Sequence, residues 1–367
     1  MKKHNFERGN TDNRGQLGES QLSRLWSLDV IRIVAIMAVV MIHVSSRFVL
    51  DYSTSSKEFV IGNFFDSISR LGVPLFMMTS GALMLDEEKT VTFPRLIQKN
   101  IKNIVILFLF WSAVYCCIYQ IWKPWKNGQA LDAEKIIWAF INGHEHMWYL
   151  YAAVGLYIVT PFLRLIVKKE NRNMVFTYLC ISMVVLFTAP LIRELSRVWS
   201  GFDYIRKWLN KFELQFFCGN TAFYLMGWYL VHGNPRRKEK LVLYILGTIC
   251  AIATILYVQY TKDLDNGYSR LNILNFLYAS SVFCAILDLV KKYPPAKTKA
   301  IHFLSRMSFG VYITHILILH QFRFLIPYSG KKPFIYLSVL YVLVFGTSLG
   351  LSWLLSKIPV LKKTVRM

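Results

Sequence analysis

Residues 24–44 read RLWSLDVIRIVAIMAVVMIHV, and this stretch decides the fold. It is apolar enough to span a membrane, yet it contains Asp29, Arg32 and His43, which hydrocarbon disfavours. Arg32 and His43 are eleven residues apart, so both project from one side of a helix, roughly 16 Å apart along its axis. Ionisable groups inside a membrane cost several kcal/mol unless they face a polar cavity. These residues are therefore candidates for function, the alternative being a helix–helix ion pair or a polar packing contact.

The composition predicts an all-α protein, a polytopic bundle of about ten transmembrane helices. Hydrophobic residues make up 54% of the 367 residues and charged residues only 17%. Only helices and closed barrels satisfy backbone groups in lipid, and the short alternating segments of barrel strands are not seen. Each expected span is long enough to cross about 30 Å of hydrocarbon. The spans lie near residues 28–48, 63–85, 102–122, 147–167, 174–192, 213–231, 241–260, 272–290, 306–326 and 334–356.

The distribution of Lys and Arg predicts that both termini are cytoplasmic. With this orientation, 26 basic residues fall on inside segments and 15 on outside segments, with Arg32 and Arg70 within spans. The net charge of +22 is thus spread over short loops, which favours a membrane protein over a nucleic-acid-binding one. The basic segment from Arg193 to Lys211 is an exception on the outside. It is either a solvated loop or a contact for lipid phosphates or an anionic carrier.

We expect one membrane domain with short polar ends. Residues 1–23 are polar and lack the apolar core of a signal peptide, so they are expected to form a disordered cytoplasmic tail. Residues 24–360 form the transmembrane domain, and residues 361–367 are expected to be a basic cytoplasmic tail. No appended soluble domain and no internal repeat is apparent. Any chemistry must therefore take place in or beside the bundle.

The second expected span carries another buried cation. Arg70 lies about two turns from the outer end of this span, at a depth similar to that of His43. A base and a fixed cation at one level suit an acyl or phosphoryl transfer site. The alternative is that Arg70 extends its side chain to the outer interface.

Histidines and aromatic residues mark two further spans. His144 and His146 are two positions apart, which separates them on a helix, and no HExxH motif follows, so we expect no metal site. Trp148 and Tyr149 suit either an interfacial aromatic belt or a lining for a sugar. His315, in the ninth span, is either a packed histidine or a functional one.

Several motifs resemble those of a known family. Residues 28–43 follow the pattern D-x-x-R-x-x-A…H through Asp29, Arg32 and His43, and residues 70–81, RLGVPLFMMTSG, follow R-x-x-V-P-L-F-x-x-x-S-G. Weaker similarities are HMWYL at 146–150, YLMGWYL at 224–230 and FGVYITH at 309–315. In this order and spacing, they resemble the acyltransferase-3 family of ten-span membrane enzymes. The chain is most similar to stand-alone members that acetylate enterobacterial common antigen and related polymers.

The resemblance implies transfer of an acyl group, by default acetyl, from acyl-coenzyme A to a hydroxyl of a surface polysaccharide or lipid-linked sugar. The site would lie in the bacterial cytoplasmic membrane, with no bound cofactor, no metal and no nucleic acid. The expected catalytic residues are His43, Arg32 and Asp29. His43 would be the essential base or an acyl carrier, Arg32 would bind coenzyme A phosphates or a thioester carbonyl, and Asp29 would orient or neutralise Arg32. Arg70 would stabilise the oxyanion or bind an anionic acceptor. The expected substrate-binding residues are Arg70, Ser80, Trp148, Tyr149 and His315.

One other function fits the buried charges. A transporter or flippase for a polyisoprenyl-linked glycan would also need a polar, aromatic-lined path across the membrane. Transporters usually show repeat symmetry, which is not apparent here. Acyl-coenzyme A, a glycan acceptor and membrane lipid are therefore the expected partners.

Overall fold

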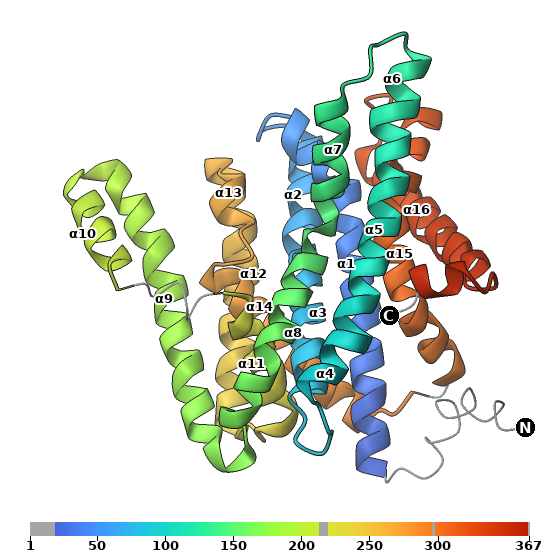
Figure 1. The fold of residues 1–367 in the computed structure, drawn as a ribbon. Coiled ribbons are helices and arrows are strands. Elements are labelled where there is room, and N and C mark those ends of the chain that lie inside the picture. The colour runs from blue at the N-terminus through green and yellow to red at the C-terminus, as the bar shows by residue number, and fades with distance from the viewer. Residues whose placement is uncertain (1–18, 213–218, 296–297, 366–367) are drawn as a thin grey trace, which may run out of the picture.

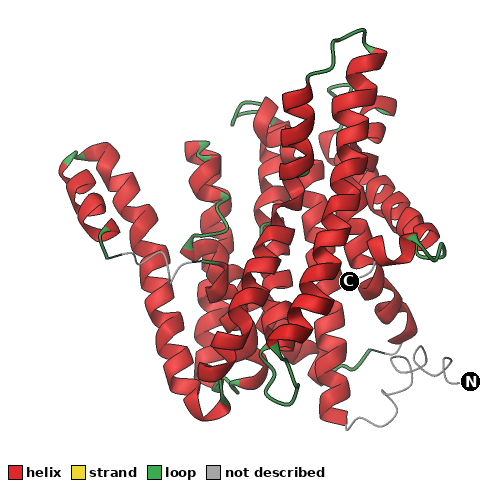
Figure 2. Ribbon diagram, in the orientation of Figure 1, coloured by secondary structure: helices red, strands yellow, loops and turns green. Residues whose placement is uncertain are grey.

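The computed structural model describes residues 19–212, 219–295 and 298–365, and these ranges form helices joined by loops, with no strand among them (Figures 1 and 2). The protein is a helical membrane bundle, as predicted. The α-helices are α1 (Glu19–Asp51), α2 (Lys57–Ser69), α3 (Gly72–Met84), α4 (Phe93–Arg95), α5 (Lys102–Cys116), α6 (Lys123–Lys126), α7 (Ala133–Asn142), α8 (Trp148–Ile166), α9 (Arg172–Val198), α10 (Gly201–Asn210), α11 (Asn220–His232), α12 (Arg237–Thr261), α13 (Leu264–Gly267), α14 (Ile273–Lys292), α15 (Thr298–Leu325) and α16 (Pro333–Leu355).

Short segments of other helix types connect some of them. Two π-helical segments flank α5, and three 3₁₀ segments lie elsewhere: η2 (Leu96–Ile101), η3 (Cys117–Trp122), η4 (Glu145–Met147), η5 (Lys169–Asn171) and η7 (Leu361–Thr364).

Eight helical stretches in the described part of the chain are long and apolar enough to cross a membrane. They coincide with eight of the ten expected spans. The second expected span is divided into α2 and α3, and the sixth corresponds to α11, of 13 residues. The residues expected to begin the sixth span, 213–218, lie outside the described residues.

The division between α2 and α3 falls beside Arg70. Helix α2 ends at Ser69 and α3 begins at Gly72, so Pro74 lies in the first turn of α3, where a missing N–H leaves no helical hydrogen bond broken. The sequence predicted one continuous span here. The structure instead places Arg70 at a junction of two helices.

Helices α3 and α11 cross at unusually close range through two glycines. A Cβ atom built on Gly81 would lie 1.8 Å from the backbone oxygen of Tyr224, and one built on Gly227 would lie 1.9 Å from that of Met78. Small residues of this kind let two membrane helices bring their backbones together. The crossing therefore fixes α3, which carries Ser80, against the centre of the bundle.

Helix α1 is the packing centre of the protein. It contacts α2, α3, α14, α15 and α16, and its apolar residues Ile31, Ala35 and Val40 are completely buried. Figure 1 shows the connection between α1 and α2, the connection between α6 and α7, and α13 toward one end of the bundle. The helix begins at Glu19 rather than at Arg24, while residues 1–18 of the expected tail lie outside the described residues.

The first residues of the expected basic tail are folded against the bundle. Residues Leu361–Thr364 form a 3₁₀ turn, and Thr364 and Val365 are buried. The indole of Trp111 on α5 donates a hydrogen bond of 2.9 Å to the backbone oxygen of Thr364. Folding of this segment buries the apolar Val365 and gives the buried indole N–H a hydrogen-bond acceptor. This gain outweighs the tendency of the neighbouring lysines to keep the segment in water. Residues 366–367 lie outside the described residues.

We expect Trp111→Phe to destabilise the protein by about 1–3 kcal/mol, because the buried backbone oxygen of Thr364 then loses the indole N–H that donates to it. Thermal unfolding in detergent measures the effect. Trp125→Phe is the matched control, because that side chain is 70% exposed and should leave the melting temperature unchanged. Equal melting temperatures for both variants would contradict the predicted contribution of this hydrogen bond.

Candidate active site

Asp29 is fixed by two residues of α15. Its carboxylate accepts a hydrogen bond of 2.8 Å from the Ser305 hydroxyl and lies 3.5 Å from Nδ1 of His302. Arg32 is 3.9 Å from the same carboxylate. Asp29 is buried while the Arg32 side chain remains 37% exposed. The carboxylate therefore orients the guanidinium group while leaving much of it accessible.

Arg32 faces two tyrosines of α8. It lies close enough to Tyr149 and Tyr157 to act on both electrostatically. Ser80 of α3 lies near the Tyr149 side chain, and Asn100 of η2 lies near that of Tyr157. The structure thus brings together Arg32, Ser80 and Tyr149, which the sequence had placed on three separate spans. Four elements converge on a polar region around the Arg32 side chain.

His43 lies against α15. Its imidazole is partly exposed, and its ring centroid is 5.1 Å from that of the completely buried His315. The guanidinium groups of Arg70 and Arg323 are both near enough to act on it electrostatically. Arg323 also donates hydrogen bonds from Nη2 to the backbone oxygens of His43, at 2.7 Å, and Val44, at 3.2 Å. The structure therefore brings His43, Arg70 and His315 together.

Arg70 is held by a carboxylate and an aromatic ring. It forms an ion pair with the buried Asp66, and its guanidinium carbon lies 3.9 Å from the ring centre of Tyr268. The Tyr268 hydroxyl in turn donates to Asn63 at 2.8 Å. A cation–π contact and a buried carboxylate hold the cation inside the bundle. The Arg70 side chain keeps 24% of its surface exposed and is near enough to His43 to act on it electrostatically.

Trp148 lies apart from this group. The guanidinium carbon of Arg270 is 4.0 Å from its ring centre, and Arg270 also contacts Asn220 at 3.4 Å. This is a cation–π pair between α8 and the loop before α14. The ring of Trp148 is also 6.5 Å from that of Tyr149. Among the residues expected to bind substrate, Arg70 and His315 lie near His43, whereas Ser80, Trp148 and Tyr149 have no described contact with the histidines.

Three more histidines extend the group, and the sequence had not assigned them a role. The ring of His146 is 5.4 Å from that of His315, and its Nδ1 is 3.1 Å from Nδ1 of His144. His320 accepts or donates a hydrogen bond of 2.6 Å with the Tyr119 hydroxyl, and its ring is 6.2 Å from that of His144. The histidines thus form a continuous row, in the order His43, His315, His146, His144 and His320.

The expectation that His144 and His146 point apart was wrong. It assumed an α-helix, whereas His144 is extended, with φ −78° and ψ 148°, and Glu145–Met147 form a 3₁₀ turn. In this turn the two imidazoles converge, with ring centroids 5.1 Å apart. Within the described residues, no group of three or more His, Cys, Asp or Glu side chains could hold a metal ion.

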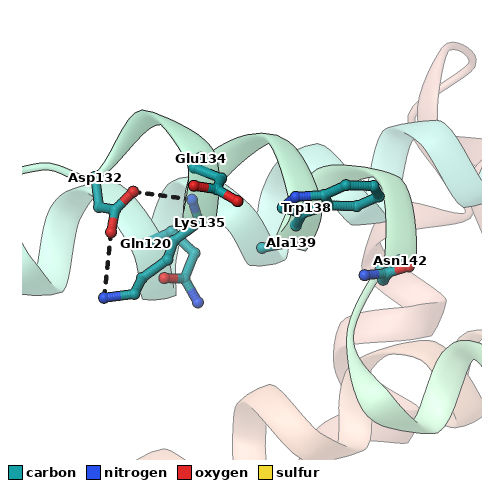
Figure 3. A pocket seen from close by; sticks show the side chains of 8 residues that line it. Gln120, Asp132, Glu134, Lys135, Trp138, Ala139 and Asn142 are labelled. Carbon is teal, nitrogen blue, oxygen red and sulfur yellow. Dashed lines mark hydrogen bonds and ion pairs between the residues drawn. The ribbon is translucent and has the colours of Figure 1, made fainter.

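A hollow of about 530 Å³ is lined by residues of η3 and α7 (Figure 3). Asp132 caps α7, and hydrogen bonds from the Lys135 backbone and side chain hold the pKa of its carboxyl below the usual range. Gly143, at the end of the hollow, leads directly to His144. The lining residues are Gln120, Asp132, Glu134, Lys135, Trp138, Ala139, Asn142 and Gly143.

Comparison with known proteins gives one match. The family model described as an acyltransferase domain, that of the acyltransferase-3 family, matches residues 25–357, nearly the whole chain. A search of the curated proteins and a search of the solved structures found no match. The matched residues include the α1 group, the α2–α3 junction and the histidines of α15. The chain therefore belongs to the acyltransferase-3 family, as the motifs of its first two spans suggested.

Proposed function

We propose that this acyltransferase is an O-acyltransferase of the bacterial cytoplasmic membrane. It moves an acyl group, by default acetyl, from acyl-coenzyme A to a hydroxyl of a surface polysaccharide or lipid-linked sugar, as enterobacterial common antigen O-acetyltransferases do. The observation that carries the proposal is the position of His43. Its ring centroid is 5.1 Å from that of His315, Arg323 donates to its backbone oxygen, and Arg70 is near enough to act on it electrostatically.

The chemistry follows from these groups. A hydroxyl is a weak nucleophile near neutral pH, and imidazole is the side chain suited to take its proton. His43 removes this proton while the oxygen attacks the thioester carbon, or it accepts the acyl group first and passes it on. In either case a C–O bond to the acceptor forms, the C–S bond breaks, and the proton ends on the sulfur of coenzyme A.

Arg70 is the candidate for stabilising the negative charge that develops on the carbonyl oxygen. A fixed cation in a site with little water stabilises such charge more than it would in bulk water. The ion pair with Asp66 and the contact with Tyr268 hold the guanidinium group in place before the substrate arrives. Arg323 holds the backbone of α1 at His43 and so maintains the base at the same depth.

Arg32 would bind the phosphates of coenzyme A. Its partly exposed side chain lies roughly 16 Å from His43 along α1, a distance that an extended pantetheine arm can span. With the amino terminus inside, as the basic residues suggest, Arg32 faces the cytoplasmic donor and His43 lies in the outer half of the membrane.

Replacing Arg32 by Gln should raise the KM for acyl-coenzyme A about 10- to 100-fold with a smaller change in kcat. Hydrogen bonds to charged groups contribute about 1.5–3 kcal/mol, and a residue distant from the reacting carbon stabilises substrate and transition state alike. Steady-state release of coenzyme A thiol measures both constants. Arg95→Gln, on exposed α4, is the matched control. An unchanged KM would remove Arg32 from the donor site.

The function is tested with purified protein in detergent, radiolabelled acetyl-coenzyme A and polyisoprenyl-linked oligosaccharides. We expect label in the extracted glycan together with an equal amount of free coenzyme A thiol. Mild alkali should release the label as acetate, because an ester forms and an amide does not. The proposal fails if no acceptor gains label while acyl-coenzyme A stays intact. It also fails if the protein moves the glycan across liposomes without acyl-coenzyme A.

A further inference from the structure

The hydrogen bonds of His315 fix its tautomer. Its Nδ1 lies 2.6 Å from the backbone oxygen of Tyr312 and 3.2 Å from that of Val311. Backbone oxygens only accept hydrogen bonds, so Nδ1 must carry the proton. In a neutral imidazole the other nitrogen, Nε2, then carries a lone pair and can only accept a hydrogen bond.

This lone pair lies in the interior without a partner. The His315 side chain is completely buried, and among the described residues its Nε2 has no hydrogen-bond partner. An unpaired buried acceptor costs about 1–3 kcal/mol, so its presence requires an explanation. The hydrogen bonds of Nδ1 to the backbone would suffice for a structural role, but they leave the unpaired Nε2 unexplained. The orphaned Nε2 points to a donor supplied by the working site.

Three rings face His315, from three elements. They are His43 of α1 at 5.1 Å, His146 of η4 at 5.4 Å and Tyr312 of its own helix at 6.3 Å between ring centroids. The Tyr312 hydroxyl is already used, because it donates to the backbone oxygen of His146. Nδ1 of His146 is paired with His144, which also acts on His315 electrostatically, while Nε2 of His146 has no partner among the described residues and its ring is the more distant of the two imidazoles. His43 is the nearest of these rings and has a nitrogen available.

We propose that His315 is a positioning residue for His43, accepting the N–H of the His43 imidazole at its Nε2. The structure describes both rings and has no hydrogen bond between them, so the His43 ring must turn its N–H toward Nε2 for this bond to form, and rings at this separation can bring facing nitrogens to about 3 Å. Since His315 can only accept, His43 must present its protonated nitrogen to it. The opposite nitrogen of His43 then carries the lone pair that the reaction uses. The proposal rests on the acyl transfer proposed above.

The arrangement would serve both possible roles of His43. If His43 takes the hydroxyl proton, it becomes an imidazolium whose N–H bond to His315 is charge-assisted and therefore stronger. The proton then passes from the same nitrogen to the sulfur as the C–S bond breaks. If His43 carries the acyl group, the fixed lone pair is the one that attacks the thioester. A catalytic histidine held in one tautomer by a hydrogen-bond acceptor is a recurrent device of acyl-transfer sites.

Two variants of His315 separate positioning from packing. His315→Gln keeps a carbonyl oxygen near the place of Nε2, whereas His315→Met fills a similar volume without a comparable acceptor. We expect kcat to fall about 10-fold for Gln and about 10³-fold for Met, with the KM for acyl-coenzyme A within about twofold of the wild type. Gln321→Met, at an exposed position of the same helix, should keep the wild-type kcat. Wild-type kcat in the Met variant, or equal losses in Met and Gln, would overturn the proposal.

A second measurement does not depend on activity. Histidine ¹⁵N chemical shifts, recorded on the labelled full-length protein in nanodiscs, report which ring nitrogen carries the proton, and His43→Gln assigns the His43 signal. We expect one His43 tautomer in the wild type, a mixture in His315→Met and a single tautomer again in His315→Gln. A mixture in the wild type would overturn the positioning role even if acyl transfer is observed. Conversely, a single tautomer without any acyl transfer would support the positioning role and refute the proposed function.

Discussion

His43→Ala is expected to abolish acyl transfer, with kcat falling at least about 10³-fold while the protein remains folded. A positioned general base contributes about 10²–10⁴-fold, and loss of a covalent carrier costs more. The imidazole lies beside His315 and within the electrostatic influence of Arg70 and Arg323, and alanine offers no group that could take up a proton or an acyl group there. Transfer of label from acetyl-coenzyme A to the glycan measures the effect.

The two roles of His43 differ in a single-turnover experiment. If His43 carries the acyl group, the wild type should release one coenzyme A per protein before any acceptor is added, and His43→Ala should release none. If His43 is a base, release should require the acceptor. Met37→Ala, an exposed position on the same helix, controls for effects on α1. Full transfer by His43→Ala would remove His43 from the reaction.

The second large effect concerns folding. Gly81→Ala and Gly227→Ala should each destabilise the protein by about 3 kcal/mol or more, because the new Cβ meets a backbone oxygen that cannot move alone. The whole of α3 or α11 must shift, and with it Ser80 and the region around Arg32. The yield of monodisperse protein and its melting temperature measure the loss.

Gly346→Ala provides the matched control for the crossing. A Cβ atom at this position of α16 meets nothing within 4 Å, so the substitution should be neutral or slightly stabilising, since alanine favours helix more than glycine does. Wild-type melting temperatures for both Gly81→Ala and Gly227→Ala would show that the two helices are not held at the distance described.

The sequence predicted the helical class and the shared side of Arg32 and His43, because a membrane helix imposes its own periodicity on the residues it contains. It also predicted a similar depth for Arg70 and His43 from their distances to span ends, and the structure places the two residues near enough to interact electrostatically. These features depend on one helix at a time. They need no knowledge of how helices pack.

The remaining features depend on packing between distant segments. Arg323 reaches the backbone of His43 across 280 positions of sequence, and nothing local marks it as different from other basic residues near a span end. His144 and His146 converge because the backbone between them forms a 3₁₀ turn, which the expected helix period excluded. The local sequence offers one indication of this turn: Gly143 stands directly before His144, where it can interrupt a helix.

The buried end of the described chain affects how the protein is best handled. Thr364 and Val365 fill space beside α5 and α15, so an affinity tag attached directly behind them would begin inside a packed surface. A long flexible spacer, or a tag at the amino terminus, avoids pulling this segment away. A protease site placed close behind Val365 would be cut slowly for the same reason, because cleavage requires an extended and accessible backbone.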